Sequence, residues 1–198
     1  MAGDATTVDD FMVAHARDFN CLADEDRTTR KRALQKLSSL PSTQPPDVLA
    51  HAWEAALRVP VLKAFADPVE KNRELAVALA NELFGALPAP ALAATLPYAM
   101  PVLVARVGGA PVAEGSEELR LQLLGLLRTL VDRGGDALAV HLPELTQILA
   151  ASFADPFPDA KKLGCALAVA VAAALPTHVE PHCAPLVRAL QPAFAHQH

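Results

Sequence analysis

One charge motif occurs four times in this chain, and its spacing limits the folds that the chain can adopt. An acidic residue stands six positions before a basic residue, ahead of an apolar segment, in the pairs Asp24–Arg30, Asp67–Arg73, Glu114–Arg120 and Asp155–Lys161. The acidic members follow one another at steps of 43, 47 and 41 residues. Periods of this length are typical of stacked helical repeats, in which each unit buries its apolar face only against its neighbours.

Composition restricts these repeats to helices. Hydrophobic residues make up 52% of the chain, but aromatic residues make up only 5%. Ala and Leu, both strong helix formers, supply most of the apolar residues. Sheets favour β-branched and aromatic residues, so a β-sandwich or barrel is disfavoured. We therefore predict an all-α protein.

Each period predicts two antiparallel helices. Capping signals such as Asp47 after two prolines, and Ser116 before two glutamates, mark where helices begin. The predicted first helices of the pairs are 8–21, 47–66, 91–107, 137–153 and 179–195, and the predicted second helices are 25–39, 69–86, 116–133 and 158–175. The second helices carry apolar stripes at helical spacing, for example Leu119, Leu123, Leu126, Leu127 and Leu130. Stacking these stripes predicts a right-handed α-solenoid whose second helices line the concave side.

The chain is expected to form a single domain of about four helical hairpins followed by an unpaired terminal helix. The predicted repeats are 8–40, 47–87, 91–134 and 137–175, with a half repeat at 179–195. Only His196-Gln197-His198 follow that last helix, where a new second helix would begin. On this basis we expect the sequence to be a fragment of a longer chain.

The motif resembles the HEAT-repeat family. The segment Val61-Leu62-Lys63-Ala64-Phe65-Ala66-Asp67-Pro68 leads into Arg73-Glu74-Leu75-Ala76-Val77, as the end of a HEAT first helix leads into the second. The resemblance implies that the acidic and basic residues pair between neighbouring repeats as a structural ladder. Its members in this chain would be Asp24, Arg30, Asp67, Arg73, Glu114, Arg120, Asp155 and Lys161.

A narrower resemblance, to HEAT-repeat factors that assemble axonemal dynein arms, covers roughly residues 25–198. It rests on the segment from Glu117 to Asp132, on Asp155-Pro156-Phe157, on the Cys165 helix and on Pro176-Thr177-His178. This resemblance implies a cytoplasmic, non-enzymatic scaffold needed for cilium motility. Its partners would be dynein arm subunits and other assembly factors or chaperones.

The sequence leaves two other function classes open. One is a different HEAT adaptor, such as a transport receptor or a phosphatase or translation scaffold. The other is an enzyme, which is disfavoured because the acid–base pairs recur once per repeat, whereas an active site is rarely copied. We predict no catalytic residues, no cofactor and no metal, and interpret His178, His182 and Cys183 with Glu180 as a polar helix entry.

A surface for protein partners is predicted at Arg30, Lys31, Lys71 and Glu82. The net charge of −5 disfavours nucleic acid as a partner. The charge-free segment 83–105 could suggest a membrane span, but Pro88 and Pro90 are expected to break its helix. We therefore expect no membrane association.

Overall fold

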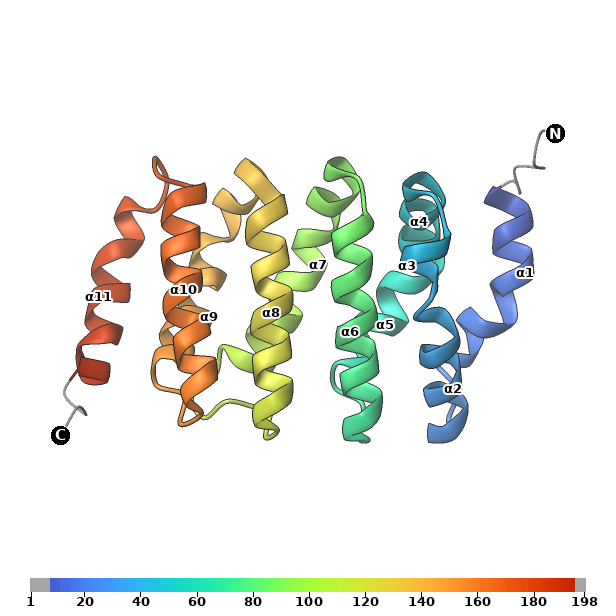
Figure 1. Ribbon diagram of the computed structural model, residues 1–198, viewed down its shortest axis with the longest axis horizontal. Helices are drawn as coiled ribbons and strands as arrows, with labels where there is room; N and C mark the ends of the chain where they lie inside the picture. The colour runs from blue at the N-terminus through green and yellow to red at the C-terminus, as the bar shows by residue number, and fades with distance from the viewer. Residues whose placement is uncertain (1–7, 195–198) are drawn as a thin grey trace. The chain divides into compact units, whose positions relative to one another are not determined.

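The computed structural model describes residues 8–194, and all the regular secondary structure in that range is helical (Figure 1). This confirms the predicted fold class. By their internal contacts the residues group into two compact units, Met1–Pro88 and Ala89–His198. The division falls between the expected repeats 47–87 and 91–134.

Unit 1 contains the first two expected helix pairs. Its elements are α1 (Val8–Cys21), α2 (Arg27–Leu37), α3 (Leu40–Thr43), α4 (Pro46–Ala52), η1 (Trp53–Leu57), α5 (Arg58–Ala64) and α6 (Glu70–Ala86). The expected helices 8–21, 25–39 and 69–86 correspond to α1, α2 and α6. The expected helix 47–66 corresponds to α4, η1 and α5, because η1 is a π-helical turn in its middle.

The core of unit 1 lies around α6. Helices α2, α3 and α5 all pack against α6, and α1 packs on α2. Trp53 meets Phe84 edge to face with 5.2 Å between ring centroids, and both side chains are buried. Leu79 and Leu83 of the predicted stripe are also buried, whereas Leu75 is partly exposed.

Unit 2 arranges its helices in two layers. Its elements are α7 (Ala89–Val107), α8 (Glu117–Gly134), η2 (Gly135–His141), α9 (Leu142–Phe153), α10 (Pro158–Ala174) and α11 (Glu180–Phe194). The first helices α7, α9 and α11 pack in succession, and the second helices α8 and α10 pack against each other. The five leucines predicted as the stripe of α8 are all buried.

Helix α7 differs from the expectation drawn from its prolines. Pro90 does not break the helix, because it lies in the first turn, where its missing N–H would have no intrahelical partner. The helix runs for 19 residues through Pro97 and Pro101. It is therefore long and apolar enough to cross a membrane by length and composition. A core helix of a soluble protein passes the same criterion, and α7 packs on α8 and α9.

At two positions in unit 2 the structure explains why the residue is glycine. Gly135 follows the last residue of α8 with a φ of +52°, a backbone conformation that residues with a side chain rarely adopt. Gly164 on α10 faces Ser152 of α9, where an added Cβ would lie 2.0 Å from the Ser152 Oγ. This glycine therefore allows α9 and α10 to approach closely.

Candidate functional site: an arginine clamp in each unit

Each of the four acidic residues of the repeated motif closes a turn onto the backbone. The carboxylate accepts a hydrogen bond from the main-chain N–H two residues later, in the pairs Asp24–Asp26, Asp67–Val69, Glu114–Ser116 and Asp155–Phe157, at 2.8–3.0 Å. That second residue is the N-cap of the next helix. Its carbonyl accepts the N–H of the motif's basic residue. The six-residue spacing is therefore an acidic turn followed by a basic residue in the first turn of the helix.

In unit 1 the side chain of Arg30 joins two consecutive repeats, between the turn at Asp24 and Glu25 and the carboxylate of Asp67. Its Nε donates to the Asp67 Oδ2 at 2.6 Å and its Nη2 to the Asp67 Oδ1 at 3.2 Å. Its Nη1 donates to the carbonyls of Asp24 and Glu25 at 2.8 and 2.9 Å. One guanidinium thus holds the turn of its own repeat and the carboxylate of the next, and we call this arrangement a clamp.

Unit 2 contains a second clamp with the same set of hydrogen bonds. Arg120 donates through Nε and Nη2 to the carboxylate of Asp155 at 2.7 and 2.9 Å. Its Nη1 donates to the carbonyls of Glu114 and Gly115, both at 3.2 Å. Charge-assisted, bidentate pairs of this geometry are among the stronger hydrogen bonds in proteins.

The clamps identify the partner of the Asp67 carboxylate. Arg73 stands six positions after Asp67, but its Nη1 donates to the Asp67 main-chain carbonyl at 3.0 Å. The Asp67 carboxylate instead binds Arg30 and the Val69 N–H. The arginine reaches back along its own helix only as far as the backbone of the turn, because the carboxylate points toward the preceding repeat.

The remaining ladder residues lie in different surroundings. The side chain of Glu114 is fully buried and pairs with Arg106 of α7 at 2.5 Å. Asp24 is exposed; its carboxylate closes the turn at the Asp26 N–H, and its carbonyl accepts a hydrogen bond from Arg30. Within residues 8–194, Lys161 has no ion pair. A continuous ladder of all eight residues stays a prediction, because the contacts described here each join only a few of its members.

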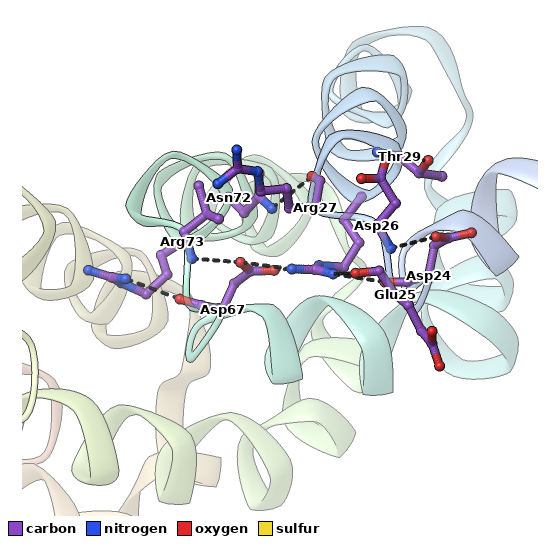
Figure 2. A network of polar contacts seen from close by, with 10 residues as sticks. Asp24, Glu25, Asp26, Arg27, Thr29, Asp67, Asn72 and Arg73 are labelled. Carbon is purple, nitrogen blue, oxygen red and sulfur yellow. Dashed lines mark hydrogen bonds and ion pairs between the residues drawn. The ribbon is translucent and has the colours of Figure 1, made fainter.

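Asn72 is a member of the unit 1 clamp that sequence reasoning missed. It is fully buried, and its Nδ2 donates to the Arg27 carbonyl at 3.2 Å (Figure 2). Burial by itself raises the pKa of Asp67, but the hydrogen bonds from Arg30, the Val69 N–H and Asn72 lower it below its ordinary value overall. The sequence signal that could have identified Asn72 is its polar side chain among the apolar positions of the predicted helix 69–86.

A cavity borders each clamp. The cavity in unit 1 has a volume of about 420 Å³, and its lining includes Leu22, Asp24, Arg30, Pro60, Asp67 and Pro68. The cavity in unit 2 has a volume of about 400 Å³, and its lining includes Val112, Glu114, Arg120, Ala151, Asp155 and Pro156. In both units the cavity lies between the turn of one repeat and the end of the next repeat's first helix.

The residues predicted as a partner surface lie at different levels of exposure. Lys71 and Glu82 on α6 are exposed, and Lys71 pairs with Glu74 at 2.5 Å. Lys31 on α2 is partly exposed. The Arg30 side chain is only 16% exposed because the clamp holds it. The structure therefore commits Arg30 to an internal contact.

The histidines near the start of α11 bond to threonines. His178 Nδ1 lies 3.0 Å from the Thr177 Oγ1, and His182 Nδ1 lies 3.1 Å from the Thr146 Oγ1. Among residues 8–194 no group of three or more His, Cys, Asp or Glu side chains is placed to hold a metal ion.

Helical pairs joined by inter-repeat clamps define a helical-repeat protein of the solenoid class. Solved structures share this fold: a designed armadillo repeat protein matches with a TM-score of 0.65 and 19% identity, over 87% of this chain and 69% of that one. A designed armadillo repeat protein in complex with the peptide (KR)4 matches with a TM-score of 0.68 and 16% identity, over 96% of this chain and 79% of that one.

The chain belongs to the dynein axonemal assembly factor 5-like family, whose TPR-repeat profile matches residues 21–198. The steps of 41–47 residues exceed the ~34 residues of a TPR unit and agree with the length of HEAT and armadillo units. Dynein axonemal assembly factor 5 of Xenopus laevis is 37% identical over 99% of this chain and 23% of its own length. The Mus musculus and Homo sapiens proteins of that name are each 35% identical, over 89% and 88% of this chain and 22% and 21% of their own lengths.

Proposed function

We propose that this chain is a non-enzymatic, cytoplasmic scaffold that helps to preassemble axonemal dynein arms before they enter the cilium. The observation that carries the proposal is the 37% identity to the Xenopus laevis assembly factor over 99% of the chain. The solenoid fold supports a scaffold role, because stacked repeats present extended surfaces to protein partners. The chain spans 21–23% of the length of the curated relatives, so extending the role of those whole proteins to this chain is part of the proposal.

The proposed partners are dynein arm subunits and other assembly factors or chaperones. We place a candidate contact surface on the second helices, which a right-handed solenoid of these repeats would turn to its concave side. Lys71 and Glu82 on α6 are exposed, and we assign their charges to that surface. Reversing them gives a variant of unchanged net charge, so a loss of binding would reflect the position of the charges.

The test is affinity purification of the tagged chain from ciliated cells. We expect dynein heavy chains and other assembly factors to co-purify, and the double reversal Lys71→Glu with Glu82→Lys to reduce their yield without lowering the melting temperature. Reversal of Arg188, exposed on α11, is the control and should reduce the yield less. Recovery of nuclear transport or translation proteins without dynein chains would overturn the proposal in favour of another adaptor role.

A further inference from the structure

Helix α2 carries an unusual concentration of positive charge. Its eleven residues include five cations, Arg27, Arg30, Lys31, Arg32 and Lys36, and no acidic residue. The chain as a whole has a net charge of −5. The sign of the charge on this helix is therefore opposite to that of the protein that carries it.

Two of the five cations have structural partners within unit 1. Arg30 belongs to the clamp with Asp67. The Nζ of Lys36 lies 2.7 Å from the Asp18 Oδ2 on α1, which ties α1 to α2. These two contacts account for the presence of a basic residue at positions 30 and 36.

The other three cations have no ion pair within residues 8–194. Arg27 and Arg32 are exposed and Lys31 is partly exposed. The nearest acidic residues in sequence form no ion pair with them within residues 8–194: the Asp24 carboxylate accepts the Asp26 N–H, and the Asp26 carboxylate accepts the N–H and the hydroxyl of Thr29. The hydrogen bonds from Thr29 lower the pKa of Asp26, and the charge of Arg32 adds to this effect. We call Arg27, Lys31 and Arg32 the basic face of α2.

This arrangement is unfavourable for the helix itself. Arg27 and Lys31 are four residues apart, as are Arg32 and Lys36, and like charges at this spacing repel on a helix surface. Arg27 also lies in the first turn of the helix, where the helix dipole favours negative charge. Within residues 8–194 no ion pair of the basic face offsets these costs, and a contact with an acidic partner would do so.

We propose that the basic face of α2 binds an acidic segment of a partner polypeptide; this rests on the proposed scaffold function and names a docking surface for it. Charge complementarity defines the partner. A membrane surface fits less well, because the exposed large hydrophobic residues among residues 8–88 are Val13 and Val59, and α2 carries none to insert. A continuous polyanion would also meet Asp24, Glu25 and Asp26 directly before the helix, whereas separate carboxylates can avoid them.

The test uses the 198-residue chain and a fluorescein-labelled peptide of alternating Glu and Gly, about twelve residues long, which exceeds the length of α2 when extended. Binding is followed by fluorescence anisotropy at low salt. The triple variant Arg27→Glu, Lys31→Glu, Arg32→Glu should bind roughly tenfold more weakly, as expected for the loss of three exposed ion pairs. The matched control Arg17→Glu, Lys63→Glu, Arg188→Glu changes the net charge by the same amount at exposed positions elsewhere and should bind nearly as well as the natural chain.

A second variant separates loss of binding from loss of folding. Alanine at positions 27, 31 and 32 favours a helix, so the circular dichroism spectrum should not change. This variant should still bind the peptide more weakly than the natural chain does. Equal weakening by the triple variant and its control would overturn the basic face as the site. Tighter binding of phosphatidylserine vesicles, or of a single-stranded RNA of similar charge, than of the peptide would overturn the choice of partner.

The two proposals fail in distinguishable ways. If the peptide does not bind the natural chain while dynein heavy chains still co-purify with it, only the docking surface is overturned. If the peptide binds at the basic face while dynein chains are absent from the purification, the scaffold role in dynein assembly is overturned instead.

Discussion

The guanidinium of Arg120 binds the carboxylate of Asp155 through two hydrogen bonds, although 35 residues separate them in sequence. Both side chains are nearly inaccessible to solvent, at 8% and 4% exposure. The same helix carries a second arginine pair, Arg128 with Asp132, at a similar distance but with 43% and 49% exposure. The two pairs on α8 therefore differ in burial and in reach, because Arg120 joins two repeats and Arg128 pairs within its own helix, and their effects on stability can be compared within one protein.

The clamp arginine should be worth far more to stability than the exposed one. Arg120→Ala leaves the buried Asp155 carboxylate and two turn carbonyls without their donor, so we expect a loss of about 3 kcal/mol in the free energy of unfolding. Arg128→Ala removes only a solvent-screened contact and should leave unfolding unchanged within error. Urea denaturation of both variants would measure the difference. Equal losses would show that the buried contacts of Arg120 add no more to stability than an exposed ion pair does.

The partner of Asp67 can be identified by double-mutant cycles. We expect Arg30→Ala and Asp67→Asn to couple by about 1–3 kcal/mol, because the two side chains bond directly. Arg73→Ala and Asp67→Asn should couple much less, since Arg73 contacts the carbonyl of Asp67, which the Asn variant keeps. Strong coupling only in the Arg73 cycle would show that Asp67 pairs within its own motif instead.

The Asp67 carboxylate should make stability depend on pH in the acid range. Its pKa in the folded protein lies below the ordinary value of 3.8, despite burial, because of its hydrogen bonds. A lowered folded pKa gives a contribution that is present above pH 3.8 and is lost as the pH falls through the folded value. The difference in unfolding free energy between the natural chain and Asp67→Asn should therefore shrink below that pH. A difference that stays constant down to strong acid would contradict the assigned cause.

Two helix glycines should respond in opposite ways to a single methyl group. Gly164→Ala places a Cβ 2.0 Å from the Ser152 Oγ and 2.7 Å from its Cβ, so α9 and α10 must move apart at a cost of about 1–3 kcal/mol. Gly125→Ala meets nothing within 4 Å and should be neutral or stabilise α8 by up to ~1 kcal/mol. Thermal melts of the two variants would test this. If the Gly125 variant were destabilised, a neighbouring group would have to lie near this position, where the structure has open space.

The repeat pattern was predictable from the sequence because it depends on local chemistry. A turn closed by its own carboxylate, an N-cap two residues later and a basic residue in the first helical turn all lie within seven positions, and each recurs with the motif. The starts of α6, α8 and α10 were therefore predicted to within one residue. The apolar stripe of α8 was predictable for the same reason, since helical periodicity decides which side chains share a face.

Non-local features of the site were not predictable in this way. The spacing placed Asp67 and Arg73 in one motif, but which guanidinium reaches a carboxylate depends on where the preceding helix places its own arginine, and 37 residues separate Arg30 from Asp67. Nothing local distinguishes Gly164, where an added Cβ would meet Ser152 of another helix, from Gly125, where an added Cβ would meet nothing within 4 Å. The sequence by itself determined the helices and their repeat, because backbone hydrogen bonds and side-chain periodicity act over a few residues. Only the tertiary structure decided the pairing of the charges and the close contacts, because these depend on how far apart packed helices lie.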